Sequence, residues 1–303
     1  MNPKLKLLKA LTLPDFPSGS SINFYDGKLF LIGDDASHIL VLDVNYQKVD
    51  AIHLFDSSAK RISKPEKADF ETSTVLVLDG KDYLLVLGSG SRKNRMSLIL
   101  VNLKKEWGFE SFNYREFIKR IKEAGIEEVN IECATVIGDH FLLGNRGNTE
   151  NPKNLVIVTD IDFWQRQNEV PIAIAELELT VNSTTFIGIS ELCYAESQDI
   201  LLFTLSTELT GNSYEDGTIG DSYIGWINSA SQKINEHKLK LDGMINLLEV
   251  DPEFTGEKVE GLCIEFVSGS ECILHLISDN DQGQSKLFKV GMSYIPDSND
   301  LVI

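Results

Sequence analysis

Basic residues are scarce in this chain of 303 residues. It contains 28 Lys and Arg against 46 Asp and Glu, which gives a formal net charge of −18. A surface with this excess of negative charge is repelled by phosphate backbones and by anionic lipid headgroups. The charge balance therefore argues against nucleic acids and membranes as partners. Two explanations of the negative charge remain: it keeps the protein soluble, or it binds cations.

Long apolar runs are also missing. No stretch approaches the ~20 consecutive apolar residues that a membrane-spanning helix needs. Residues 1–13 alternate Lys with Leu and contain no uninterrupted apolar segment of the kind found in signal peptides. We therefore expect a cytoplasmic protein, unless a leader has been removed from the sequence.

Cysteine and histidine are few and poorly placed for metal binding. The four cysteines have no CxxC spacing and fall inside apolar runs, which predicts reduced core residues rather than disulfides or a zinc site. The five histidines are scattered, which argues against a histidine zinc centre. The GxSxG and HExxH motifs are absent, so neither a serine-hydrolase elbow nor a zinc-protease helix is expected.

The sequence does contain a repeat. In four copies a Glu opens a short apolar run, and a tight polar turn and a second strongly apolar run follow. An earlier copy has Ser at the Glu position. The five markers are Ser21, Glu71, Glu132, Glu191 and Glu260, separated by 50, 61, 59 and 69 residues. Each interval accommodates four strands of five or six residues, so the repeat predicts one all-β domain over residues 1–303, a five-bladed β-propeller.

The last copy lacks a fourth strand. Fourth strands are predicted in the other copies, at residues 49–54, 107–113, 171–180 and 233–240. Residues 4–13 alternate in the same way and precede the first copy, so we expect them to complete the last blade. Borrowing this strand closes the ring and leaves no exposed sheet edge. One helix is predicted over residues 114–125, capped by Asn113 and packed on the outside of the second blade.

One face of this propeller should carry the function. In an up-and-down blade the start of the first strand and the end of the second strand lie on the same face. The markers should therefore meet the loops that follow the second strands. Those loops are long, polar and rich in Gly, whereas the turns of the opposite face are minimal. They cover residues 33–35, 88–91, 144–147, 206–221 and 278–281.

Four glutamates that converge on one channel cannot all stay ionised without a counter-charge. Oxygen ligands favour a hard cation, Ca²⁺ first and Mg²⁺ second. The predicted metal ligands are Ser21, Glu71, Glu132, Glu191 and Glu260. Two alternatives stay open: each Glu caps its own strand around a water-filled channel, or pairs of carboxylates share protons.

Other residues of the loops are candidates for substrate contacts. Arg95 and Arg146 are cations on an acidic face and could hold a phosphate or carboxylate, and Asn145 and Asp279 lie in the same set of loops. The alternative is that the two arginines form salt bridges with neighbouring acids. Asp34 and Asp35 could supply a general base or a further metal ligand, or could simply form a turn.

With the ring laid out, the chain resembles the five-bladed calcium-activated nucleotidases, the soluble apyrases. Residues 258–266 are similar to that family's K-Y-E-G-I-E-F segment, and residues 26–30 with Asp34-Asp35 are similar to its first-blade G-K-L-Y and D-D motifs. The resemblance implies a central Ca²⁺ held by Ser and Glu residues, one from each blade. It assigns Ser21, Glu71, Glu132 and Glu260 as ligands.

By the same resemblance, Asp34 or Asp35 is a catalytic acid near the phosphates. The sequence departs from the family at the fourth blade, where Glu191 stands in place of a Ser and Ser190 is adjacent. The fifth-blade motif is also similar to uncharacterised bacterial propeller proteins of phytase-like or esterase-like type.

The expectation from sequence is a calcium-binding propeller, a monomer, that hydrolyses a phosphorylated small molecule at the channel mouth. The alternatives are a non-catalytic scaffold that binds a ligand or a protein, and a calcium-dependent lactonase or esterase. Because one fold hosts many functions, the choice among them depends on the site.

Overall fold

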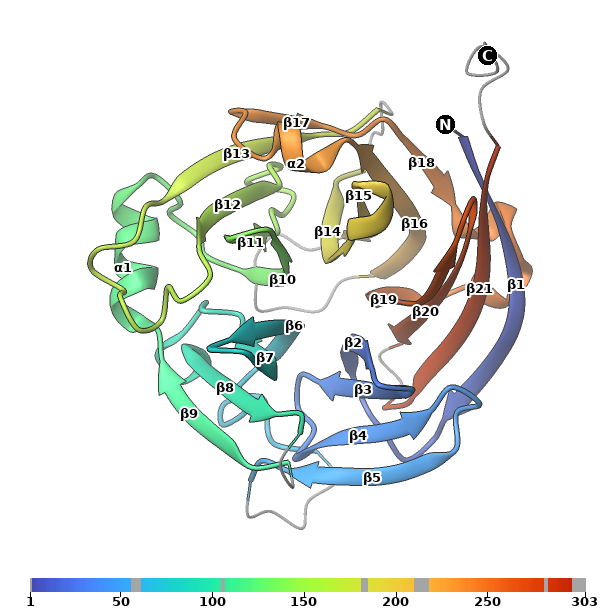
Figure 1. Ribbon diagram of the computed structural model, residues 1–303, viewed down its shortest axis with the longest axis horizontal. Helices are drawn as coiled ribbons and strands as arrows, with labels where there is room; N and C mark the ends of the chain where they lie inside the picture. Colours follow the sequence, from blue (N-terminus) through green and yellow to red (C-terminus); the bar gives the residue numbers. More distant parts are fainter. Residues whose placement is uncertain are drawn as a thin grey trace.

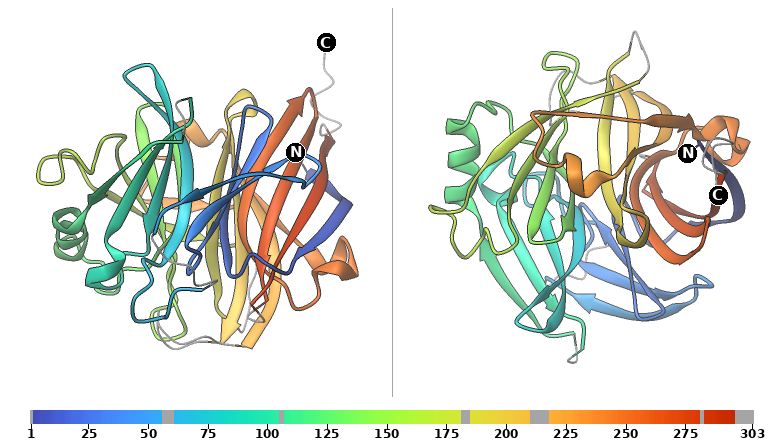
Figure 2. Two further views of the ribbon diagram at one scale, coloured as in Figure 1. Left: turned by 90° about the horizontal axis from the view of Figure 1, so that it is seen from below. Right: turned by 45° about the horizontal axis from the view of Figure 1, so that its top comes forward.

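The computed structural model describes residues 2–55, 61–104, 107–180, 185–209, 218–280 and 283–295. Across these ranges the chain forms five sheets arranged around a central axis, which confirms the predicted five-bladed β-propeller (Figure 1). The innermost strands run roughly along this axis, whereas the outer strands lie across it (Figure 1 and Figure 2). Among the described residues, no helix is long and apolar enough to cross a membrane.

The first three blades follow the chain in order. Blade 1 is β2 (Gly19–Tyr25), β3 (Lys28–Gly33), β4 (His38–Asp43) and β5 (Lys48–His53). Blade 2 is β6 (Phe70–Leu78), β7 (Lys81–Gly88), β8 (Ser97–Asn102) and β9 (Phe109–Asn113). Blade 3 begins with β10 (Ile131–Ile137), β11 (His140–Asn145), β12 (Leu155–Asp160) and β13 (Ala173–Glu178).

The last two blades complete the ring. Blade 4 is β14 (Ile187–Ala195), β15 (Ile200–Leu209), β16 (Thr218–Asn228) and β18 (Gly243–Asn246). Blade 5 is β19 (Lys258–Ser268), β20 (Glu271–Asp279), β21 (Ser285–Ile295) and β1 (Asn2–Leu13). Short 3₁₀ turns occur at Lys93–Arg95, Glu196–Gln198, Leu247–Glu249 and Pro252–Phe254.

The N-terminal strand closes the last blade, as predicted. β1 pairs antiparallel with β21 from Asn2 opposite Ile295 to Leu13 opposite Ser285, and the two strands lie side by side at the edge of blade 5 (Figure 1). Leu5 and Leu7 pack against the core between blades 4 and 5, while Lys4 and Lys6 are exposed. The Lys–Leu alternation of this segment is therefore the alternation of a half-buried edge strand.

The prediction for the fourth strand of blade 4 was wrong. Within residues 233–240 only β17 (Lys238–Lys240) is a strand, and it pairs in parallel with β13 as a fifth strand of blade 3. A short helix, α2 (Ala230–Lys233), precedes it, and β18 takes the predicted place in blade 4. The reason is steric: a Cβ at Gly243 would lie 2.3 Å from the Trp226 ring, so only glycine lets β18 approach β16 there.

The helix is confirmed with shorter bounds. The predicted cap is displaced by one residue: α1 (Arg115–Glu123) has Tyr114 at its N-cap position, and Gly125 follows the helix with φ +109°. The Asn113 side chain still accepts a hydrogen bond from the Arg115 backbone N–H (3.4 Å). Its apolar face does not pack on blade 2 alone. Phe117, Ile118 and Ile121 are buried in a cluster shared by blades 2 and 3.

The core consists of the seams between blades. Each apolar cluster of the described residues joins two neighbouring blades, and the alternating residues of one strand serve two seams. In β7, Leu84 and Val86 face blade 1 whereas Leu85 and Leu87 face blade 3. Burial on both faces explains why the second strand of each repeat is apolar throughout. The four cysteines are free, three of them buried in these seams, as predicted.

Candidate functional site

The innermost strand of every blade has a β-bulge near its start. At this point the pairing skips one residue, which is left opposite no partner in the adjacent strand. A bulge bends the strand and re-aims the side chain of the extra residue. The skipped residues are Ser20, Glu71, Glu132, Ser190 and Glu260. We call this set the bulge ring.

The bulge ring differs from the predicted markers at two blades. Glu71, Glu132 and Glu260 are bulge residues, but Ser21 and Glu191 each lie one residue further along their strands. Ser21 pairs with Ile32, and Glu191 pairs with Thr204. The sequence repeat was aligned on its Glu residues. The strand pairing aligns the blades on their bulges instead, and in blades 1 and 4 the bulge lies one residue earlier.

The bulge ring lies at the end of the channel that the long loops surround. In three blades the backbone N–H of the residue after the second strand donates to the carbonyl two positions before the bulge. These bonds run from Asp34 to Ser18 (3.0 Å), from Ser89 to Asp69 (2.9 Å) and from Arg146 to Asn130 (2.9 Å). The loop residues and the bulges therefore share one face, which we call the mouth.

The three glutamates of the bulge ring differ in their surroundings. Glu71 and Glu132 are half-buried, and Glu132 accepts a hydrogen bond from the Asn130 side chain (2.5 Å). Burial, with the charges of Asp69 and Glu132 next in weight, holds the pKa of Glu71 well above its usual value. Glu260 is buried and forms an ion pair with Lys258 (2.7 Å). Two of the three ring carboxyl groups therefore belong to blades 2 and 3.

The two serines of the bulge ring are buried and hydrogen-bonded. The Ser20 hydroxyl donates to the carbonyl of Phe70 in blade 2 (2.6 Å). The Ser190 hydroxyl accepts from Arg146 (2.8 Å), and the same guanidinium donates to the Ser206 hydroxyl (3.1 Å). Each serine therefore connects its blade to a neighbouring one.

Glu191 forms a separate layer of contacts beneath the bulge ring. Its side chain is 1% exposed and accepts hydrogen bonds from Ser21 (2.7 Å), Thr72 (3.3 Å) and the backbone N–H of Leu192 (3.0 Å). Burial raises its pKa well above the usual value, and these hydrogen bonds oppose that shift. A single carboxyl group thus connects blade 4 with blades 1 and 2.

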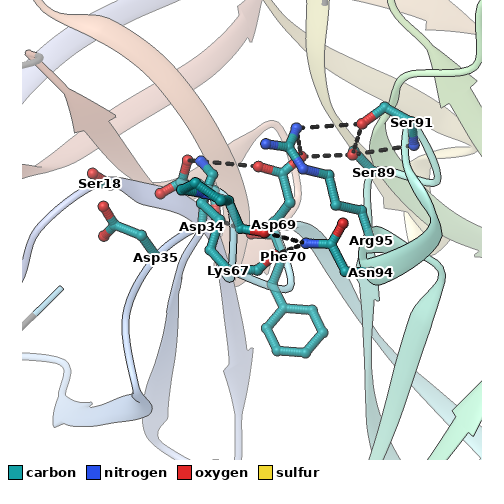
Figure 3. A network of polar contacts seen from close by, with 12 residues as sticks. Ser18, Asp34, Asp35, Lys67, Asp69, Phe70, Ser89, Ser91, Asn94 and Arg95 are labelled. Carbon is teal, nitrogen blue, oxygen red and sulfur yellow. Dashed lines mark hydrogen bonds and ion pairs between the residues drawn. The ribbon is translucent and has the colours of Figure 1, made fainter. Parts of the chain in front are cut away.

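A second group of acids lies beside Glu71. Carboxylate oxygens of Asp34, Asp69 and Glu71 lie within 4.8 Å of one another. Lys67 is buried between two of them, with an ion pair to Asp34 and another to Asp69 (2.9 Å) (Figure 3). We call these four residues the acid–lysine cluster. Asp69 also accepts from Arg95 (2.7 Å) and from the Ser89 hydroxyl (2.6 Å), so both of its oxygens are bonded.

Asp34 and Asp35 are placed differently within the mouth. Burial raises the pKa of Asp34 to about 6, against the opposing charge of Lys67. Its Oδ1 is buried and has no hydrogen-bond partner among the described residues. Asp35 is more deeply buried and accepts from the Arg61 guanidinium (2.6 Å). The Oδ1 of Asp35 is likewise buried and has no hydrogen-bond partner in the described part of the chain, so the two acids differ in depth and in the cation that bonds each of them.

The predicted substrate contacts are spread around the mouth. Arg95 is in the network around Asp69, on blade 2, and Arg146 is 6% exposed against blade 4. Asn145 accepts from the Asn130 backbone N–H (2.7 Å), and Asp279 stands opposite Lys258 in blade 5. Asp281, the second acid of the predicted loop at residues 278–281, is outside the described residues. The structure brings Arg95 near Asp34 and Glu71, and it does not bring Arg146 there.

Comparison with known proteins identifies the family of the chain. A family model described as a family of unknown function, DUF6929, matches residues 15–292. The chain belongs to this family. No curated protein matches the DUF6929 chain.

Solved structures match the DUF6929 chain over nearly its whole length. Glutaminyl cyclase of Myxococcus xanthus matches with a TM-score of 0.55 and 12% identity, over 96% of this chain and 97% of that one. A DUF4221 member from Bacteroides vulgatus matches with a TM-score of 0.45 and 12% identity, over 97% and 99%. Streptogramin B lyase matches with a TM-score of 0.36 and 11% identity, over 97% and 98%. At this identity the cyclase match shows the fold alone.

Four residues of the DUF6929 mouth escaped the sequence reasoning: Ser20, Lys67, Asp69 and Ser190. The serines were missed because a bulge shifts the register by one residue and leaves no mark in the polarity pattern. Asp69 could have been found, since it directly precedes Phe70-Glu71 at the start of a strand. Lys67 comes from the segment between blades 1 and 2, whose path the repeat does not predict.

Proposed function

We propose that this protein binds a hard divalent cation, Ca²⁺ before Mg²⁺, at the bulge ring. One observation carries the proposal: each blade presents an oxygen-bearing side chain at the same bulge, in the order Ser, Glu, Glu, Ser, Glu. Hydroxyl and carboxylate oxygens are the ligands of such cations. Burial and the neighbouring acids Asp69 and Glu132 raise the pKa of Glu71, and a bound cation would lower it again.

The bulge register strengthens the resemblance to calcium-activated nucleotidases. That resemblance implies ligands of Ser and Glu, one from each blade, with a Ser at the fourth. Once the bulges set the alignment, Ser190 takes the fourth place and Ser20 the first. The departure created by Glu191 therefore disappears, and Glu191 supports the site from below.

The activity that fits this mouth is hydrolysis of a phosphorylated small molecule. A bound divalent cation would polarise a phosphoryl oxygen and offset the charge of the phosphate. Asp34 has a buried oxygen for which the described residues offer no hydrogen-bond partner, and it would take the proton of the attacking water. Lys67 and Asp69 hold Asp34 in place, and Arg95 holds Asp69 from the other side.

A binding scaffold is the second candidate, and one observation favours it. The cations predicted to hold a substrate already have protein partners: Arg95 bonds to Asp69, and Arg146 bonds to Ser190 and Ser206. In that case the ring cation would connect the five blades, and the loops of the mouth would bind a ligand without turnover. A calcium-dependent lactonase or esterase would use the same ring with an uncharged substrate.

The test begins with the cation. Calorimetric titration with Ca²⁺ and Mg²⁺ should show one site in the wild type and at least tenfold weaker binding in Glu132→Gln, a loss of about 1.4 kcal/mol. Glu110→Gln is the matched control, because Glu110 is exposed on β9, away from the mouth. Absence of binding by the wild type would refute the site.

The same samples then separate the activities. They are screened against nucleotides, phosphate monoesters, lactones and carboxylic esters, with Asp34→Asn beside the wild type. Turnover of phosphate compounds that is lost in Asp34→Asn supports the hydrolase, and turnover of lactones or esters supports the alternative enzyme. A bound cation without turnover of any compound supports the scaffold.

A further inference from the structure

The seam between blades 5 and 1 holds a buried histidine that bonds to a side chain of the other blade. Its core is apolar, with Phe16, Ile22 and Leu29 of blade 1 packed against Ile277 and Leu287 of blade 5. Within this core His275 is 0% exposed, and its Nδ1 lies 2.9 Å from the Tyr46 hydroxyl. A buried imidazole in an apolar seam is costly unless both of its nitrogens are bonded.

Every strand of blade 5 contributes one residue to the group that contains this histidine. Lys9 in β1 stands opposite Lys289 in β21, and Lys289 stands opposite His275 in β20. Glu265 occupies a second bulge of β19. Residues that stand opposite one another in a sheet point to the same face, so the side chains of these residues all lie on the face of blade 5 that packs against blade 1. We call Lys9, Glu265, His275 and Lys289 the polar row.

Two residues of the polar row contact the Tyr46 side chain of blade 1. Tyr46 is in the turn between β4 and β5, in the left-handed region with φ +67°, and is 3% exposed. His275 contacts its hydroxyl, and the Lys9 ammonium lies 4.9 Å from its ring centroid. Lys9 also donates to the neighbouring Asn45 carbonyl (2.8 Å). The turn is thus held from two strands of blade 5.

The hydrogen-bond pattern fixes the tautomer of His275. Glu265 is bonded to Lys289 (2.7 Å), and the bonds from Lys289 and His275 outweigh burial and keep the pKa of Glu265 below its usual value. An ionised Glu265 only accepts, so the His275 Nε2–H must donate to it (2.8 Å). Nδ1 is then the acceptor, and the Tyr46 hydroxyl donates to it.

We propose that the polar row is a latch that closes the propeller ring, and that it releases when His275 takes up a second proton. A proton on Nδ1 removes the acceptor of the Tyr46 hydroxyl, which must then reverse its bond, and adds a third cation at the end of the row Lys9–Lys289–His275. The other titratable groups that face this place are Glu265, Tyr46 and the Cys263 thiol. Burial outweighs Glu265 and lowers the pKa of His275, in agreement with this reading.

The direction of the pH effect follows from linkage. A histidine whose folded-state pKa is lowered stabilises the closed seam above its free pKa of about 6.5, and this contribution is lost as the pH falls. Opening of the seam should therefore increase up to about tenfold between pH 7.5 and pH 5.5, the limit set by a free pKa near 6.5.

Hydrogen–deuterium exchange tests the latch, with rates corrected for intrinsic exchange. Peptides over residues 39–47 and 271–279 report this seam, and peptides over residues 81–102 report blade 2. In the wild type the first set should exchange up to about tenfold faster at pH 5.5 than at pH 7.5. His275→Gln keeps a donor for Glu265 but cannot take up a proton, so its rates should not depend on pH.

Tyr46→Phe removes only the hydroxyl and should speed exchange of this seam about fivefold at pH 7.5, the worth of one hydrogen bond. Tyr25→Phe is the matched control, because Tyr25 donates to Asp82 across the seam of blades 1 and 2 (2.7 Å). The proposal is overturned if His275→Gln retains the pH response, or if Tyr46→Phe exchanges like the wild type. If His275→Gln does not fold, the two remaining measurements test the proposal. It is overturned if wild-type exchange of this seam does not depend on pH, or if Tyr46→Phe exchanges like the wild type.

Discussion

Ser190 and Glu191 are neighbours in the chain but lie in different layers of the central channel. Ser190 occupies the bulge of blade 4 and accepts a hydrogen bond from Arg146 (2.8 Å). Glu191 directs its carboxylate to Ser21 (2.7 Å) and Thr72 (3.3 Å) on the opposite side of the channel. A shift of one residue therefore separates a candidate ligand of the mouth from a side chain that ties blades together.

This separation predicts a ranking of variants. Ser190→Ala removes a ring oxygen and should weaken Ca²⁺ binding about tenfold, or about 1.4 kcal/mol. Glu191→Gln should weaken it less than Ser190→Ala does, because the Glu191 oxygens are bonded to Ser21, Thr72 and Leu192. Isothermal titration of both variants measures the ranking. The reverse order would mean that Glu191 is the fourth ligand.

Lys67 should be a major source of stability at the mouth. Lys67→Met leaves Asp34 and Asp69 without their shared buried cation and should cost about 3 kcal/mol of unfolding free energy at pH 7.5. Lys104→Met is the control: Lys104 pairs with Asp82 from a side chain that is 65% exposed, so its loss should cost much less stability than Lys67→Met. Urea denaturation measures both.

The cost of Lys67→Met should depend on pH. Burial raises the pKa of Asp34 to about 6 and Lys67 opposes that rise, so loss of Lys67 raises the pKa further. The folded variant then holds a proton that the unfolded chain releases near pH 3.8. Stability falls with rising pH wherever the folded state binds more protons. The deficit should be largest near pH 8 and smallest near pH 5, and a deficit that grows on acidification would contradict this account of Asp34.

The N-terminal strand should be required for a closed, monodisperse protein. Deletion of residues 1–13 removes β1 and exposes the edge of β21 along its whole ladder. An unpaired edge invites pairing between chains. Gel filtration should show aggregates, and thermal unfolding should lose its cooperativity. Lys4→Glu with Lys6→Glu, which changes only exposed side chains of β1, should behave like the wild type.

The thiols should be protected in the folded protein. Burial raises the pKa of Cys193 and of Cys272 to about 12 and holds the pKa of Cys133 and Cys263 well above the usual value. The thiolate is the reactive form, so iodoacetamide at pH 8 should leave the native protein unmodified over minutes. In urea all four should be alkylated. Rapid native labelling of one cysteine, read by mass spectrometry, would show that its seam opens readily.

The repeat was readable because burial imposes a pattern on each blade. A second strand buried on both faces must be apolar throughout, as β7 is, and short turns must carry Gly or Asp, as Asp79-Gly80 does. A bulge obeys no such rule, because it changes pairing without changing polarity. The blade to which β17 belongs could not be predicted for a similar reason. Lys238-Leu239-Lys240 alternates like any edge strand, and this local pattern does not indicate which blade the strand joins.

The sequence by itself determined the number of blades, the closure by residues of β1 and the acidity of the mouth, because local pattern and charge are properties of segments. Tertiary structure alone decided which side chains meet. The bulges replaced Ser21 and Glu191 by Ser20 and Ser190 in the ring, and the chain between blades brought Lys67 to Asp34. The Tyr46–His275 contact joins residues that are 229 positions apart in the chain. Local sequence patterns do not predict contacts between residues so widely separated.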